Sequence, residues 1–169
     1  EICSRMSGVA ADNPHAWRPQ FQSAQEISTV AQNNRYIGYP YTRAMNPILA
    51  VDMAAAVIMT SVGKARELGI DPSQWIYLRG GADLNDIGYV SERPTLHHAP
   101  AINLAWNAVS AHAGITLDEM ARFDIYSCFP SAVQIACNEI GLSPLDDRGV
   151  TVTGGLPCFG GPGNNYSLH

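Results

Sequence analysis

From about residue 41 onward, apolar and polar positions fall into short blocks that alternate between strand-like and helix-like patterns. Short runs rich in apolar and β-branched residues predict buried strands at 54–59, 75–78, 123–126 and 150–152, although periodicity alone leaves a helix open for the first. The blocks between these runs have helical start and stop signals. An alternation of strands and helices is typical of an α/β layered fold.

Three helices are predicted from these signals. The stretch 61–68 is followed by Gly69, and 100–113 begins with a proline and stops at Gly114. A third helix starts at Pro130 and runs to Gly141. A proline at the first helical position and a glycine just beyond the last one are the preferred residues at those places, so these boundaries are well defined.

Residues 1 to about 40 have a different texture, polar and interrupted by prolines. Ser23 and Glu26 have the spacing of a capping box, in which each side chain binds the other residue's backbone N–H. Thr116 and Glu119 repeat that spacing later in the chain. We therefore expect an irregular, partly helical region ahead of the α/β part.

Composition and charge limit the possible functions. A chain of 169 residues with 46% hydrophobic residues can bury a core, and its net charge of -5 argues against binding to nucleic acid. No apolar run approaches the roughly 18 residues of a membrane span. Only 15% of the residues are charged, against roughly 25% in typical domains. We expect much of the chain to face other protein, and the isolated chain to expose apolar surface and self-associate.

Four cysteines are present, and none forms a CxxC pair. Without a signal-peptide pattern, reduced thiols and a cytoplasmic location are the expectation. Cys137 lies within a predicted helix among apolar residues, so we expect it to pack in the core. The chain starts at Glu1 without a methionine and stops at His169, directly after a glycine-rich loop, so we expect a fragment of a larger protein.

Three features are candidates for chemistry. The loop that follows the last predicted strand is either a tight turn or a set of backbone N–H donors for an oxyanion; its glycines are Gly154, Gly155, Gly160, Gly161 and Gly163. Cys128 lies where a strand meets a helix, so it is either a thiol favoured as thiolate by the helix N-terminus or a small buried residue. His169 follows the loop and is either an ordinary helix residue or a catalytic one. The histidines lack metal-ligand spacing, so no metal site is expected.

Taken in order along the chain, five motifs resemble the C-terminal half of thiolases. They are Asn46 to Ala56, Pro100-Ala101-Ile102, Thr116 to Glu119, Tyr126-Ser127-Cys128-Phe129, and the loop from Gly154 to Asn165. The chain looks most similar to sterol-carrier-type thiolases and to thiolase-like proteins called acetyl-CoA acetyltransferases. On this resemblance, residues 1–40 are the end of the loop domain and 41–169 a truncated C-terminal domain.

The resemblance implies a five-layered αβαβα fold, of which this chain is an incomplete half with a mixed sheet and covering helices. CoA thioesters would bind between the core and the loop domain, with coenzyme A as a substrate and no covalently bound cofactor. The nucleophilic cysteine would come from the N-terminal half of the parent chain, upstream of Glu1, so this chain alone is expected to be inactive. A homodimer or a small partner protein is the implied assembly.

Two catalytic positions depart from the thiolase pattern. Thiolases have Asn-Glu-Ala-Phe or His-Asp-Cys-Phe where this chain has Tyr126 to Phe129, so Tyr126 replaces a residue of the first oxyanion hole. Their Gly-His-Pro motif falls on Gly160-Gly161-Pro162, which lacks the histidine that activates the nucleophile. His169 is the expected substitute.

The resulting site prediction has two parts. The expected catalytic residues are Tyr126, Cys128 and His169. The expected CoA-binding residues are Asn46, Phe129, Gly154, Gly155, Gly160, Gly161 and Gly163, whereas Ile48 stands where a CoA-contacting serine is frequent.

Two functions follow from the resemblance. The first is acyl transfer on a CoA thioester, by thiolysis of a 3-ketoacyl-CoA or the reverse condensation, with carbon–carbon lyase chemistry on a CoA-linked side chain as a variant. The second is a degenerate thiolase fold that binds acyl-CoA or a partner protein without turnover. The missing histidine favours altered or absent thiolysis, and the retained scaffold makes a CoA thioester the expected ligand of both.

Overall fold

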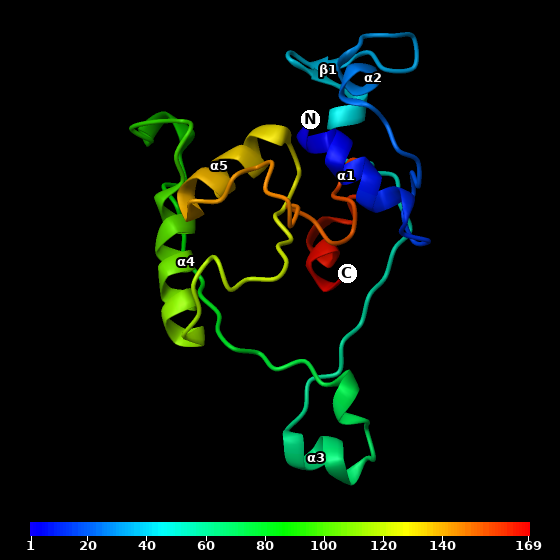
Figure 1. Ribbon diagram of the computed structural model, residues 1–169. Coiled ribbons are helices and arrows are strands. Elements are labelled where there is room, and N and C mark those ends of the chain that lie inside the picture. The colour runs from blue at the N-terminus through cyan, green and yellow to red at the C-terminus, as the bar shows by residue number, and fades with distance from the viewer.

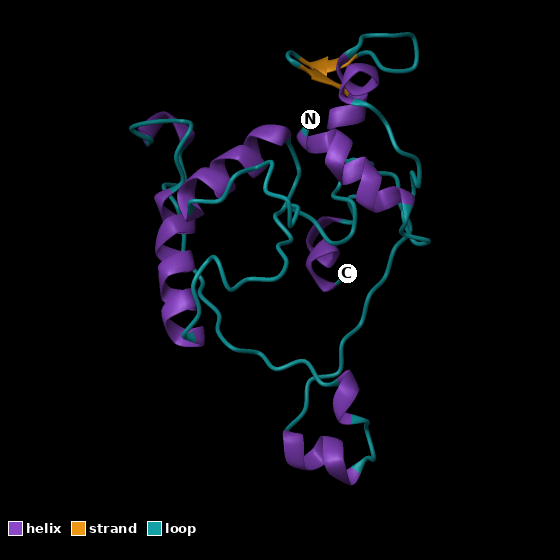
Figure 2. Ribbon diagram, viewed as in Figure 1, coloured by secondary structure: helices purple, strands orange, loops and turns teal.

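The computed structural model describes all residues from 1 to 169. Five α-helices are joined by long irregular segments, with one small sheet and four short 3-10 turns (Figures 1 and 2). The helices are α1 (Ile2–Ala11), α2 (Ala24–Ser28), α3 (Val62–Glu67), α4 (Pro100–Ala113) and α5 (Pro130–Ile140). The strands are β1 (Tyr36–Gly38) and β2 (Tyr41–Thr42), and the turns are η1 (Arg43–Met45), η2 (Pro72–Gln74), η3 (Val90–Glu92) and η4 (Gly163–Leu168).

The three helices predicted from start and stop signals are all present. α4 and α5 begin at their prolines and are capped at their C-termini by Gly114 and Gly141, whose φ angles of 65° and 77° are left-handed. α3 is capped by Ser61, whose hydroxyl accepts the backbone N–H of Lys64. Local signals at the ends were sufficient here because a cap acts through residues adjacent in sequence.

Both predicted capping boxes have their side chains in place. Ser23 and Glu26 exchange hydrogen bonds at the start of α2, a short helix that ends at Ser28. The Glu119 carboxylate likewise accepts the backbone N–H and the hydroxyl of Thr116. Only a turn follows Thr116, so a capping box here stabilises a turn without a helix.

The region expected to be irregular holds α1, which the sequence reading did not single out. Its buried residues are Cys3, Met6, Ser7 and Ala10, spaced three and four apart, so they form one face of the helix. The same region also holds the β1–β2 hairpin, an antiparallel pair that turns through the cis Tyr39–Pro40 peptide bond.

The four predicted strands at 54–59, 75–78, 123–126 and 150–152 are not strands in this structure. The first two are extended and largely exposed, with Ile58 88% and Ile76 93% exposed, and no segment of the chain pairs with them. Strand structure requires a neighbouring backbone to bind its N–H and C=O groups. The prediction was wrong because it scored the side chains without knowing which partner the backbone would have.

The other two segments do lie side by side. The Ile125 N–H donates to the Val150 carbonyl, at 3.0 Å, and this is the single backbone bond between them. The next N–H, that of Val152, donates to the Asp124 carboxylate instead. The Asp124 side chain thus takes the place of a backbone carbonyl as acceptor, and no β-ladder forms between the two segments.

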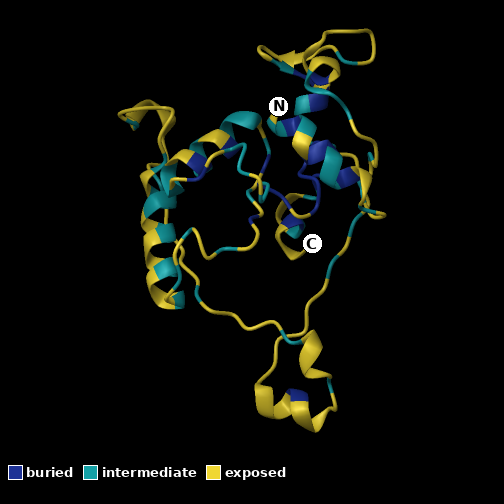
Figure 3. Ribbon diagram, in the orientation of Figure 1, coloured by how far each residue is buried: buried dark blue, intermediate teal, exposed yellow.

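The largest core cluster joins α1, α5 and these two segments. It comprises Met6, Phe123, Val133, Cys137, Leu142 and Val150. Cys137 is fully buried there, which confirms its predicted packing role. Figure 3 shows buried residues concentrated on α1, α5 and the C-terminal loop, whereas α3 and its two long connections are almost entirely exposed.

α4 packs on α5 but buries little of its own surface, and its Leu104 side chain is 59% exposed. Glu139 ties the two helices together, since its carboxylate accepts the Ala99 N–H and contacts His98 Nδ1, both at 2.9 Å. These hydrogen bonds lower the pKa of Glu139, and the bond from the Ala99 N–H has the largest effect.

None of the helices combines the length and apolarity that crossing a membrane requires.

Candidate functional site

Residues 154–163, here called the glycine loop, run through the interior of the protein. Every residue from Thr153 to Gly161 is buried. Gly154 passes α1 so closely that a Cβ on Gly154 would lie 2.5 Å from Cβ of Ala10. A Cβ on Gly155 would lie 2.8 Å from Sδ of Met6. Side chains at these positions would push α1 away, which explains why the loop needs glycine.

The other end of the loop is held by the chain that precedes Met53. The Ile48 N–H donates to the Leu156 carbonyl and the Gly161 N–H to the Ile48 carbonyl. A Cβ at Gly161 would stand 3.1 Å from Pro47 Cβ. There is little room for a histidine side chain at the position that thiolases fill with one.

Most backbone N–H groups of the loop are already used. Those of Gly154, Gly155 and Leu156 donate to hydroxyls, of Thr151, Thr153 and Ser127 respectively, and those of Cys158, Phe159 and Gly161 donate to carbonyls. The N–H of Gly160 makes no hydrogen bond. Among the loop's buried donors, it is therefore the one free for a ligand oxygen.

A chain of polar side chains supports the loop from beneath. The Asp124 carboxylate accepts the Thr151 hydroxyl, which contacts Thr153, and Thr153 Oγ1 lies 2.7 Å from the Tyr166 hydroxyl. Burial raises the pKa of Tyr166 to about 12, so its phenol is neutral and can donate. These hydrogen-bonded side chains connect the loop to η4, although they lie up to 42 residues apart in sequence.

A cavity of about 510 Å³ opens beside the loop and contains His169. Its lining combines polar and apolar side chains, from Asn13, His15, Trp17, Asp52, Met53, Ala54, Val152, Thr153, Phe159 and His169. We call it the His169 cavity. Gly160 adjoins it, because a Cβ there would contact Met53 and Trp17. No cysteine lines it.

His169 is oriented by two neighbours. Its ring meets Phe159 edge to face at 5.2 Å, and Nε2 lies 3.2 Å from the Asn165 side-chain nitrogen, which also donates to the Met53 carbonyl. An amide nitrogen can only donate, so Nε2 accepts and the proton of the neutral ring is assigned to Nδ1. With this tautomer, Nδ1 of His169 is the ring atom that can donate a hydrogen bond.

Tyr126 and Cys128 lie behind the cavity and do not line it. Tyr126 meets Tyr166 edge to face at 5.7 Å, and Tyr166 in turn contacts Phe159. Cys128 is partly buried against the cluster of Leu156, Phe159 and Tyr166, two residues before α5 begins. The structure therefore brings all three predicted catalytic residues to one aromatic cluster, with His169 alone on its open side.

Two predicted CoA-binding residues lie elsewhere. Asn46 Nδ2 donates to the Thr42 carbonyl, and Phe129 stacks on Tyr41. The sequence reading missed Asn13, Trp17, Asp52 and Asn165. Asn13 Nδ2 donates to the Thr153 carbonyl across 140 residues of sequence, and no local pattern predicts such a contact.

The thiols differ sharply in their surroundings. All four cysteines are free. Burial raises the pKa of Cys3, and it raises those of Cys137 and Cys158 to about 11. These three are therefore protonated and unreactive near neutral pH. No group of histidine, cysteine and acidic side chains is placed to hold a metal ion.

Comparisons with known proteins bear on this arrangement. No family model matches the chain. It is 36% identical over 111 residues to an acetyl-CoA acetyltransferase of Candida albicans. The matched residues make up 66% of this chain and 25% of that protein. The crystal structure of a monomeric SCP2-thiolase-like protein type 1 from Mycobacterium smegmatis matches 99% of this chain and 37% of its own, with 43% identity and a TM-score of 0.86.

The chain thus spans about a quarter of the curated relative and little more than a third of the solved one. Similarity along its whole length, in sequence and in structure, nevertheless confirms the resemblance and the fold class expected from the five motifs. The chain belongs to the thiolase superfamily and has the fold of part of an SCP2-thiolase-like protein.

Proposed function

We propose that the protein containing this chain is an acyltransferase of thiolase type that acts on acyl-CoA or 3-ketoacyl-CoA thioesters. The observation that supports this most is the His169 cavity, where an oriented histidine lies beside the glycine loop. One relative is named an acetyl-CoA acetyltransferase, which agrees with this substrate class. Thiolase chemistry requires donors that stabilise the negative charge developing on a carbonyl oxygen.

The residues suggest a division of roles. The Gly160 N–H and the Nδ1–H of His169 would donate to the thioester or ketone oxygen, as an oxyanion hole does. Trp17 and Phe159 would exclude water from the acyl group. Since no cysteine lines the cavity, none of the four in this chain is assigned as the nucleophile.

His169 therefore replaces the missing thiolase histidine in a changed role. In thiolases the histidine of the Gly-His-Pro motif activates the nucleophile, whereas here Nε2 is occupied by Asn165 and cannot act as a base without losing that hydrogen bond. Donation from Nδ1 keeps the bond intact. Tyr126 and Cys128, behind the cavity, would position the aromatic cluster that carries His169.

The test is CoA-dependent loss of 3-ketoacyl-CoA absorbance, with the full-length protein and its His169→Ala variant. We expect turnover by the parent and a loss of about 10²-fold or more in kcat for the variant, the effect of removing one oxyanion donor. His97→Ala removes an exposed histidine that does not line the cavity and is the matched control. Turnover that is insensitive to His169→Ala would refute its assigned role.

A second function is supported by the lack of space at Gly161. A protein that keeps the fold but has no room for the activating histidine would bind acyl-CoA without thiolysis. In the same assay, CoA binding without turnover in the parent supports this alternative.

The solved relative is described as monomeric, so we propose a monomer for the full-length protein rather than the homodimer expected from thiolases.

A further inference from the structure

The wall of the His169 cavity beside Gly160 is formed by Met53 and Trp17, which both line the cavity. A Cβ on Gly160 would lie 2.6 Å from Met53 Sδ and 3.3 Å from Trp17 Cδ1. Val51 Cγ1 would also be 3.3 Å away. Three apolar side chains thus converge on the position where Gly160 has no side chain, so the space next to the loop is narrow and closed there.

This wall is fixed to the elements that carry His169. The Trp17 N–H donates to the Phe159 carbonyl at 3.0 Å, and the Met53 carbonyl accepts the Asn165 side-chain amide at 3.1 Å. Asn165 also contacts His169, and the Met53 side chain packs against the aromatic cluster behind the cavity. Moving the wall outwards would cost these contacts, so a ligand meets it in place.

The rest of the cavity offers little apolar surface to a long alkyl chain. Half of the lining residues are polar, namely Asn13, His15, Asp52, Thr153 and His169. The Asp52 carboxylate has no ion-pair partner in this chain. An alkyl chain laid over it would remove water from an unpaired charge, which is costly. An acyl group that extends beyond the apolar wall therefore gains no favourable surface.

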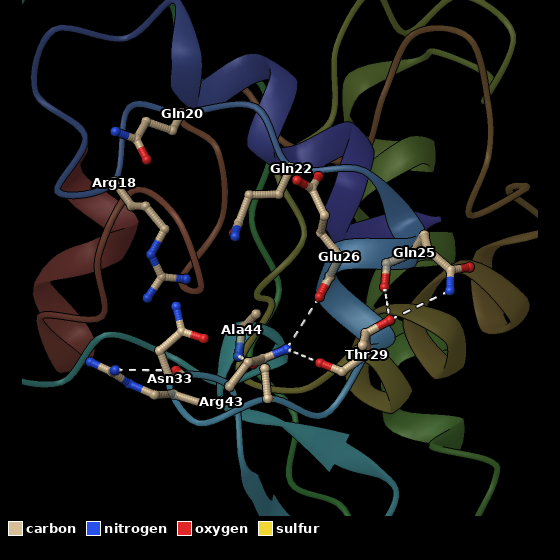
Figure 4. Close-up of a pocket in the computed structure, with 11 residues that line it drawn as sticks. Arg18, Gln20, Gln22, Gln25, Glu26, Thr29, Asn33, Arg43 and Ala44 are labelled. Atoms are coloured by element: carbon tan, nitrogen blue, oxygen red, sulfur yellow. Dashed lines mark hydrogen bonds between the residues drawn. The ribbon is translucent and has the colours of Figure 1, made fainter.

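The neighbouring hollow does not extend the apolar surface either. Arg18 follows Trp17 but lines a separate hollow of about 590 Å³, into which its side chain is directed (Figure 4). Only two of the eleven residues that line this hollow are hydrophobic. Among the residues of this chain, a long acyl group thus finds no second apolar space next to the cavity.

The volume of the His169 cavity, about 510 Å³, sets a further limit. A bound thioester brings the sulfur end of the CoA arm into the same space as its acyl group. Sites for whole small molecules have volumes of roughly 300–1,000 Å³. A cavity of this size that is shared in this way leaves room for a short acyl group.

We propose that Met53, backed by Trp17, determines the length of the acyl group, so that the substrates are short-chain rather than medium- or long-chain thioesters. This inference rests on the proposed function, since it takes the His169 cavity as the site of the acyl group. A short acyl group would end against the Met53 thioether. A longer one would collide with Met53 or be turned onto Asp52 and His15.

The experiment is calorimetric titration of the full-length protein with CoA, S-ethyl-CoA and S-octyl-CoA. The two thioethers have the chain lengths of acetyl and octanoyl groups but cannot transfer them, so binding is measured without turnover. We expect S-octyl-CoA to bind about tenfold or more weakly than S-ethyl-CoA. Met53→Ala, which shortens the wall, is expected to raise the affinity for S-octyl-CoA about tenfold and to change that for S-ethyl-CoA by less than about twofold.

Met59→Ala is the matched control, because Met59 is exposed and does not line the cavity, so the ratio of the two affinities should stay as in wild type. Met53→Leu keeps a side chain of similar size and should also retain the wild-type ratio. Equal affinities for the two thioethers in wild type, or an unchanged ratio in Met53→Ala, would overturn the chain-length role while CoA binding remains. A failure of all three ligands to bind would refute the proposed function itself, and this inference with it.

Discussion

At Gly161 the backbone leaves almost no space for a side chain. A Cβ would lie 3.1 Å from Pro47 Cβ and 3.3 Å from the Ile48 carbonyl oxygen. Restoring the thiolase histidine by Gly161→His should therefore destabilise the protein by about 1–3 kcal/mol, as overpacking does. Gly81→His, at an open position, is the control for urea unfolding. A Gly161→His variant as stable as wild type and more active would show that the loop accommodates the histidine.

The four thiols should react very differently. Cys128 is partly buried, whereas Cys3, Cys137 and Cys158 are buried with raised pKa values. In native protein at pH 7.5, roughly one unit below the ordinary thiol pKa, we expect mass spectrometry to find the carbamidomethyl group from iodoacetamide on Cys128 first. Cys128→Ser should remove the fast phase. Fast labelling of Cys158 would mean that the glycine loop opens in solution.

Between elements, the hydrogen bond between the Tyr166 and Thr153 hydroxyls links η4 to the start of the glycine loop. Tyr166→Phe removes the hydroxyl and leaves Thr153 with fewer partners, so unfolding should become easier by about 1–2 kcal/mol. Tyr126→Phe removes a hydroxyl from a half-exposed ring of the same cluster and serves as the comparison. An equal loss in both variants would mean that the buried hydrogen bond has no special role.

The same tyrosine predicts a loss of stability at alkaline pH. Its pKa is raised to about 12 in the folded protein, against about 10 for an unfolded chain. The neutral phenol therefore favours folding fully below pH 10, and this contribution is lost as the pH rises towards 12. Chemical denaturation between pH 9 and 12 should show a smaller pH dependence for Tyr166→Phe than for wild type. Identical slopes would contradict the assigned pKa.

What could be predicted from the sequence follows the range of the interactions. Helix ends were correct because a cap or a left-handed glycine acts within a few residues, as at Gly114 and Gly141. Predicted strands such as 75–78 were wrong, because the pattern of side chains does not show which segment will pair with the backbone. The site divides similarly: the glycine loop was evident, but the Asn13–Thr153 and Asn165–Met53 contacts join distant segments.

Across the whole molecule, many apolar side chains are exposed, which confirms only the part of the low-charge expectation that concerns apolar surface. Ile58, Ile76 and Leu78 are each more than 80% exposed, on the long connections that flank α3 (Figure 1). The isolated 169-residue chain should therefore self-associate, with a weight-average mass in sedimentation that rises with concentration. Ile58→Asp with Ile76→Asp should reduce this. A concentration-independent monomer would show that these segments fold back onto the chain.

The central claim is that the His169 cavity holds the reacting end of an acyl-CoA thioester. The most direct measurement is a crystal structure of the full-length protein with a bound, unreactive 3-ketoacyl-CoA analogue. We predict a carbonyl oxygen of the analogue at hydrogen-bond distance, about 3 Å, from the Gly160 nitrogen and His169 Nδ1. An analogue bound with its carbonyls away from the glycine loop, and the cavity left empty, would contradict the account.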